Sequence, residues 1–256
     1  MLKRTVRSCP PASGLLLLLV LSFGPWRLSI AQSPEKPFAR RNSFGIVAAF
    51  SNDSSHMLLG ESQSRKLLDF GASYSRSLIS SHLLNWQFDA EYLPLAWDSD
   101  PVLVNTTTIT STDPGFTEVI VSSQPTVSAC HPSSGSGSFP GTGTTFTFVN
   151  TCTRRWVIGQ AMSPVGFQWN FLPRHRLQPF AAGHGGYMYT SQPIPVTDAG
   201  TFNFTFDFGG GIEYFRTHSQ SIRLEYRFHH ISNNETAPAN PGIDSGLFQV
   251  SYEFGR

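Results

Sequence analysis

The sequence predicts an all-β fold, an eight-stranded antiparallel transmembrane β-barrel, and three observations support this class. Many segments alternate apolar and polar residues with the period of two that β-strands require. The connections between these segments are alternately short and long, as in barrels with turns on one side of a membrane and loops on the other. The apolar face is rich in Phe and Trp, which suits contact with lipid, whereas the polar face carries charges of both signs.

The N-terminal segment predicts a secretory signal peptide over residues 1–31. Basic residues precede the apolar run GLLLLLVLSFG, residues 14–24, and Ser29 and Ala31 occupy the small-residue positions that signal peptidase needs. The apolar run is too short to span a membrane as a helix. Cleavage after Ala31 leaves residues 32–256, which we expect to form one barrel domain.

Alternation along the remaining chain predicts the strands one by one. In FNFTFDF, residues 202–208, every second residue is Phe and the residues between them are polar. The segment that contains Trp156 and Trp169 changes parity between them, which predicts a bulge near Ser163 and Pro164. We expect strands near residues 43–51, 66–77, 82–95, 154–171, 176–190, 201–215, 219–230 and 244–254.

The charged face decides between a membrane barrel and a soluble β-sandwich or lipocalin-like barrel, whose apolar face would lie inside. Asp89, Glu91, Arg223 and Arg227 share the polar parity of their strands, and a small lumen would hold such residues as ion pairs. A soluble barrel also needs no asymmetry in the lengths of its connections. We therefore expect the apolar face to contact lipid and the charged face to line the lumen.

The third connection is the longest, from about residue 97 to 153, and it is rich in Ser, Thr, Gly and Pro. This composition predicts a flexible loop. Cys130 and Cys152 lie in it, and an even pair of cysteines in an exported protein predicts a disulfide. The formal net charge of +1 is too small to indicate a nucleic-acid partner.

The segment HHISNNETAPANPGID, residues 229–244, collects a base, a nucleophile and an acid between the last two predicted strands. Strand parity places His230, Ser232 and Asp244 on the outer surface, where polar groups are costly near lipid and need an explanation. Residues two apart on a strand share a face, so His230 could take the Ser232 proton during attack on an ester. Asp244, on the adjoining strand, could orient the imidazole.

Other residues of this segment could complete the site. Asn233 and Asn240 could donate hydrogen bonds to an oxyanion, and Gly242 would allow a close approach of the backbone. A metal site at His229 and His230 is poorly supported, because adjacent strand residues face opposite ways. We therefore expect no metal, and we interpret His229 as a packing or hydrogen-bonding residue of the lumen.

HISNNETAPANPGID resembles the signature of the lipid A 3-O-deacylase family, the PagL-type enzymes that are also described as acyloxyacyl hydrolase-like. The resemblance implies an eight-stranded barrel in the bacterial outer membrane that hydrolyses the 3-O-linked acyl ester of lipid A at the outer leaflet. It also implies that no metal or organic cofactor takes part. By the same resemblance, His230 matches the base, Ser232 the nucleophile, Asn233 the neighbouring asparagine, and Asn240 and Gly242 the residues before the acid.

The acid position of that family falls on Asp244, where the family pattern has Glu. Asp is one methylene shorter than Glu, so either the three catalytic side chains lie closer together or the site is less active. Glu235 is an alternative acid that is less well placed, because it lies away from a strand. The implied partners are lipid A or lipopolysaccharide as substrate and the membrane lipid, and the sequence leaves open whether the chain forms a homodimer.

Two rival classes stay open at this point. A non-catalytic outer-membrane barrel with a structural or adhesive role would share the strands but lack the chemistry, and its long loop would bind a partner. A soluble lipid carrier would have the barrel inverted. A requirement for detergent separates the carrier from the other two, and reaction of Ser232 with an acyl-serine inhibitor separates the enzyme from the inert barrel.

Overall fold

A computed structural model describes residues 36–112 and 115–256 of the chain. The predicted signal peptide, residues 1–31, lies outside the described residues. Among the residues that the structure describes, no helix is long and apolar enough to cross a membrane.

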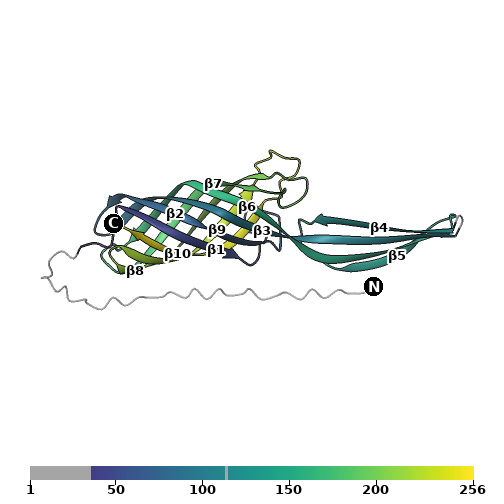
Figure 1. The fold of residues 1–256 in the computed structure, drawn as a ribbon, viewed down its shortest axis with the longest axis horizontal. Helices are drawn as coiled ribbons and strands as arrows, with labels where there is room; N and C mark the ends of the chain where they lie inside the picture. The colour runs from purple at the N-terminus through teal and green to yellow at the C-terminus, as the bar shows by residue number, and fades with distance from the viewer. Residues whose placement is uncertain (1–35, 113–114) are drawn as a thin grey trace, which may run out of the picture. The chain divides into compact units, whose positions relative to one another are not determined.

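The described chain folds into ten antiparallel β-strands (Figure 1). Eight of them correspond to strands expected from the sequence, whereas β4 and β5 were not expected. The strands are β1 (Asn42–Ser51), β2 (Lys66–Ser80), β3 (Leu84–Thr112), β4 (Gly115–Pro125), β5 (Ser133–Phe139), β6 (Thr144–Phe171), β7 (Leu177–Thr190), β8 (Phe202–Thr217), β9 (Gln220–Ser232) and β10 (Ile243–Gly255).

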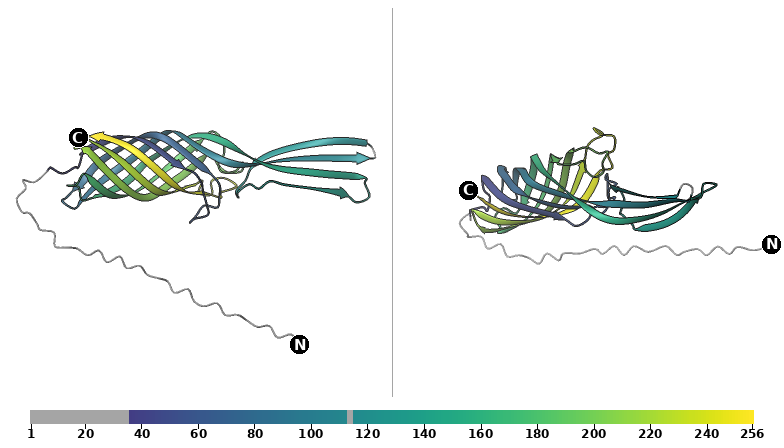
Figure 2. Two further views of the ribbon diagram at one scale, coloured as in Figure 1. Left: turned by 90° about the horizontal axis from the view of Figure 1, so that it is seen from below. Right: turned by 45° about the vertical axis from the view of Figure 1, so that its right-hand side comes forward.

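The eight predicted strands form a closed ring. The sheet order runs from β3 through β2, β1, β10, β9, β8 and β7 to β6, and an additional pairing of β3 with β6 closes it. Short turns join β2 to β3, β6 to β7 and β8 to β9, whereas the connections after β1, β7 and β9 are longer (Figure 2). The structure thus confirms the predicted eight-stranded antiparallel barrel.

The barrel lumen is filled by buried ion pairs, as the polar parity predicted. Arg223 Nη1 lies 3.0 Å from Asp89 Oδ2, and Arg227 Nη1 lies 3.1 Å from Glu91 Oε2. Arg227 Nη2 also lies 2.8 Å from Glu225 Oε2. Each buried cation therefore has a carboxylate partner, which offsets the cost of removing both charges from water.

The outer surface of the barrel is apolar, and the predicted bulge keeps it so along β6. Trp156 and Trp169 are both exposed on this surface although their sequence parity differs. The pairing of β6 with β7 shifts register between Met162 and Val165, which confirms the bulge expected near Ser163. One extra residue at this point lets aromatic side chains on both sides of it face outward.

The third connection differs from the flexible loop expected near residues 97–153. β3 continues to Thr112 and β6 begins at Thr144. The parts of these two strands that lie beyond the barrel pair with each other (Figure 1). β4 pairs with the extension of β3, and β5 pairs with the extension of β6. The segment is therefore a four-stranded sheet, which we call the extension.

The composition of the extension explains both the strands and why they were missed. Its Thr and Val residues are β-branched, which favours strands even where Gly and Ser suggest a linker. The rings of Phe148 and Phe146 lie over Gly135 and Gly137 of β5, where a Cβ would meet them at 2.7 and 2.6 Å unless the rings moved aside. These rings cover backbone that the glycines leave bare.

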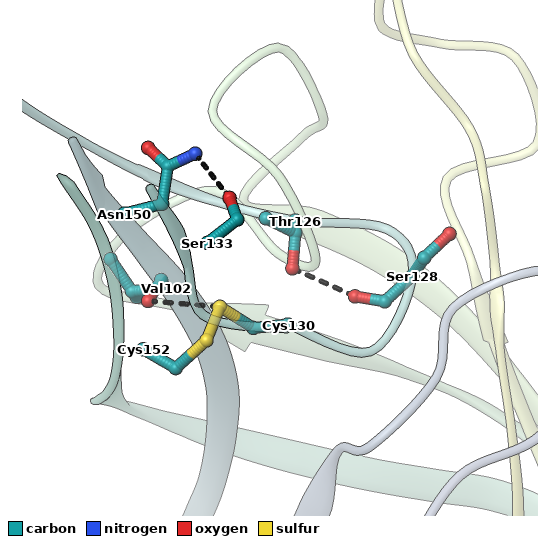
Figure 3. The surroundings of a disulfide bond; sticks show 7 residues. All are labelled: Val102, Thr126, Ser128, Cys130, Ser133, Asn150 and Cys152. Carbon is teal, nitrogen blue, oxygen red and sulfur yellow. Dashed lines mark hydrogen bonds between the residues drawn. A yellow bond between two sulfur atoms is a disulfide. The ribbon is translucent and has the colours of Figure 1, made fainter. Parts of the chain in front are cut away.

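The predicted disulfide is present between Cys130, which precedes β5, and Cys152 of β6 (Figure 3). The two Cα atoms are 5.8 Å apart. Cys152 is opposite Leu103 of β3, and the Cys130 sulfur lies 3.8 Å from the carbonyl oxygen of Val102. The bond therefore fastens the segment between β4 and β5 to the centre of the extension.

Candidate active site

His230 and Asp244 face each other across β9 and β10 on the outer side of the barrel. They are direct partners in the strand register, and His230 Nδ1 lies 2.6 Å from Asp244 Oδ1. Despite their outward parity they are only 6 % and 0 % exposed, so this polar pair is shielded from its surroundings. A carboxylate at Nδ1 leaves Nε2 as the ring nitrogen that can exchange a proton with a reacting group.

Ser232 ends β9, two residues beyond His230 and on the same face of the strand. It is half-buried, and within residues 36–112 and 115–256 no group hydrogen-bonds its hydroxyl. Ser232 and His230 both line a cavity of about 530 Å³, whose other walls include Leu59, Phe204 and Phe206. The phenylalanines come from β8, where Phe204 is opposite Ser232 and Phe206 is opposite His230.

Asp244 is covered by a segment of the β1–β2 connection, residues 54–62, which we call the strap. The backbone N–H groups of Leu58 and Leu59 donate hydrogen bonds of 2.7 and 2.8 Å to Asp244 Oδ2. The sequence analysis missed the strap, because backbone donors carry no signature in residue type. The run Met57–Leu59, apolar in an otherwise polar connection, is the one signal that pointed to it.

Asn233 and Asn240 lie together and brace the loop after β9. The Asn233 backbone N–H donates to Asn240 Oδ1 at 3.0 Å, and Asn233 Nδ2 donates to the carbonyl oxygen of Ala239 at 2.7 Å. Asn240 Nδ2 donates to Glu235 Oε1 at 3.2 Å. Asn233 is buried, and neither asparagine is among the residues that line the cavity of Ser232 and His230.

Gly242 occupies a position that only glycine suits. Its φ is +59°, in the left-handed region where a side chain is disfavoured. A Cβ there would lie 3.2 Å from both His230 Cε1 and Gly60 Cα. Gly242 thus lets the imidazole and the strap approach the start of β10.

Two other residues of this loop, Glu235 as the acid and His229 as a metal ligand, were alternatives, and the side chain of neither contacts the His230–Asp244 pair. Glu235 is exposed and contacts Asn240, whereas Asp244 holds the imidazole of His230. His229 points to the lumen, where its Nδ1 lies 3.7 Å from Asp207 Oδ2. In the part of the chain that the structure describes, no group of three or more His, Cys, Asp or Glu residues is arranged to hold a metal ion.

The arrangement suits nucleophilic attack on an ester of a lipid. A serine hydroxyl and a carboxylate-held imidazole open on one cavity, and the cavity wall contains leucine and phenylalanine. The site faces outward at the end of the barrel where β9 ends and β10 begins. An acyl chain from the surrounding lipid could therefore reach the serine without leaving an apolar environment.

The chain is similar to several known proteins. A family model described as lipid A 3-O-deacylase (PagL) matches residues 126–253. Among solved structures, the outer membrane enzyme PagL is 15% identical with a TM-score of 0.45, and the match covers 83% of this chain and 99% of that chain. Neisserial surface protein A (NspA) is 10% identical with a TM-score of 0.40, covering 84% of this chain and 97% of that chain. A search of the curated proteins finds no match.

Proposed function

We propose, because this chain belongs to the lipid A 3-O-deacylase (PagL) family, that it is a serine esterase that hydrolyses the 3-O-linked acyl ester of lipid A. The chain is a β-barrel protein of the bacterial outer membrane. The single observation that carries the proposed mechanism is the His230–Asp244 hydrogen bond, which lies beside Ser232 on the outer side of the barrel.

In the proposed reaction, the Ser232 hydroxyl attacks the ester carbonyl while His230 Nε2 takes its proton. The tetrahedral intermediate then expels the sugar oxygen, to which the imidazolium returns that proton, and the acyl chain stays on Ser232. Water, deprotonated by His230, attacks the acyl-enzyme and releases the fatty acid. Asp244 keeps the proton on Nδ1 and stabilises the imidazolium in both steps.

The oxyanion of the tetrahedral intermediate needs donors that are already in place. The side-chain amides of Asn233 and Asn240 supply them in this proposal, each through the hydrogen that the loop does not use. Their existing contacts fix the orientation of both amides within the loop after β9.

The test uses the full-length barrel in detergent micelles, with purified lipid A as substrate and released fatty acid as the measurement. Ser232→Ala and His230→Ala should each lower kcat by about 10⁴-fold or more, because nucleophile and base act as one unit. Heat-modifiable gel migration should show a folded barrel in both variants. Ser219→Ala, in the exposed β8–β9 turn, is the control and should match the wild type.

Full activity of Ser232→Ala would contradict the proposed nucleophile. A wild-type protein that releases nothing from lipid A or phospholipid would favour the inert barrel instead.

A further inference from the structure

The strap contacts the proposed acid, Asp244, directly, although the two are far apart in the sequence. Leu58 and Leu59 are 186 and 185 residues from Asp244, yet their N–H groups occupy the Asp244 Oδ2 atom, while His230 occupies Oδ1. Both oxygens of the buried carboxylate are therefore engaged. Charge-assisted bonds of this kind are roughly twice as strong as neutral ones, so they fix the rotation of the carboxylate.

The strap is itself held against the start of β10 by main-chain hydrogen bonds. The N–H groups of Ser55, Glu61 and Ser62 donate to the carbonyl oxygens of Asp244, Pro241 and Gly242 at 3.2, 2.6 and 3.1 Å. The Ser54 hydroxyl closes the base of the strap by donating to the Ser62 carbonyl oxygen at 2.9 Å. The two amides that contact Asp244 thus sit between two anchored ends.

Gly60 allows this close contact. A Cβ at residue 60 would lie 2.6 Å from the Asp244 backbone nitrogen and 3.0 Å from Asp244 Cγ. Any side chain there would push the strap away from β10, because backbone atoms cannot move aside as a flexible side chain can.

The outer side of the strap is apolar, in contrast to the backbone N–H groups that face Asp244. Leu58 and Leu59 are 63% and 61% exposed, although they are large apolar residues. Leu59 also forms part of the wall of the cavity that contains His230 and Ser232. One short segment therefore presents backbone donors to the acid and an apolar side chain to the substrate space.

We propose that the strap is a positioning element of the active site with two separable roles. Its amides at Leu58 and Leu59 hold Asp244, and through it His230, in the reactive orientation. The Leu59 side chain contacts the acyl chain of the bound lipid. This inference rests on the proposed function for its second role, whereas the first role can be tested without any activity.

The first test measures amide hydrogen exchange of residues 56–62 in detergent micelles. Asp244→Ala should speed exchange at Leu58 and Leu59 by about tenfold or more, because their acceptor is lost. Ser219→Ala is the control and should leave these rates unchanged. Unchanged exchange in Asp244→Ala would overturn the positioning role whether or not the protein is an esterase.

The second test separates the two roles kinetically. Leu59→Pro removes the N–H donor and should lower kcat by about tenfold to a hundredfold with a smaller change in KM. Leu59→Ala keeps the donor but shortens the side chain, and it should raise KM several-fold with kcat near that of the wild type. Gly60→Ala, which displaces the strap sterically, should reproduce the kcat defect of Leu59→Pro.

A double variant distinguishes positioning from general damage to the fold. In an Asp244→Ala background, Leu59→Pro should lower the residual kcat by less than about threefold, because the acceptor of the strap amides is already gone. Equal losses of kcat in both backgrounds would overturn the inference while leaving the proposed esterase intact. An inactive wild type would instead refute the proposed function and leave the exchange result standing.

Discussion

At the scale of single residues, the site centres on the carboxylate of Asp244, whose two oxygens both accept hydrogen bonds. Asp244 gives Oδ1 to His230 and Oδ2 to two backbone amides, and it has no exposed surface. The burial makes the pair strong, but it also makes the pair dependent on every partner, because a charge left unpaired in such a place is costly. Substitutions at residue 244 therefore report directly on the role of the acid.

We expect Asp244→Asn to lose most of the deacylation activity, by about 10³- to 10⁴-fold in kcat, because it cannot hold the correct tautomer of His230. Asp244→Glu should keep appreciable activity, since a carboxylate still reaches Nδ1. It should stay below the wild type, because the extra methylene must displace the strap. The measurement is kcat on purified lipid A in detergent. Glu235→Gln is the control and should matter little, and an Asp244→Asn variant as active as Asp244→Glu would contradict the role of the charge.

Strand parity alone brought His230, Ser232 and Asp244 to one surface, and the structure places the first and last of these in contact. The period of two is strict on regular strands, so a pattern read near a strand end extends to the side chains there. The strap could not be found in this way. Its hydrogen bonds come from backbone amides of a distant connection, and any residue except proline carries such a donor.

At the scale of elements, the extension shows where composition misleads. A strand exposed on both faces needs no alternation of apolar and polar residues, so the signal that located the barrel strands is missing in β4. The β4 strand, for example, is exposed along almost its whole length. Pairing with β3, rather than burial of an apolar face, accounts for its regular structure.

The Cys130–Cys152 disulfide should be dispensable for the barrel, because it joins only parts of the extension. We expect the double substitution of both cysteines by Ser to migrate as a folded barrel in heat-modifiable gels. Limited proteolysis should instead cut more readily between β4 and β5, because the segment that contains Cys130 loses its attachment to β6. A variant that fails to form the barrel would contradict this separation of the two parts.

At the scale of the whole molecule, the barrel combines a charged interior with an apolar exterior. Alternation predicted this division, since through the middle of β8, β9 and β10 the residues of each parity keep one character. The sequence could not predict which charged residues pair with each other inside the lumen. His184, for example, contacts Asp207 at 2.7 Å, a partner on a neighbouring strand that the sequence did not suggest.

Arg227 tests the contribution of the lumen to stability, because it lies within 3.2 Å of Glu91, Glu225 and Asp207. We expect Arg227→Ala to lower the free energy of unfolding by about 3–5 kcal/mol, since it leaves buried carboxylates unpaired. Urea unfolding in detergent micelles measures this change. Arg216→Ala, at an exposed position, should stay within about 0.5 kcal/mol of the wild type. Equal effects of the two substitutions would contradict the account of the lumen.

The central claim, that this barrel deacylates lipid A through Ser232, is tested most directly by mass spectrometry of lipid A from bacterial cells that express the protein. Wild type should convert lipid A to a species lighter by one 3-O-linked acyl chain. Cells that express Ser232→Ala at the same level in the outer membrane should keep the mass of cells without the protein. Identical lipid A spectra from cells with the wild type and cells without it would contradict the claim, as would the same loss of an acyl chain with Ser232→Ala.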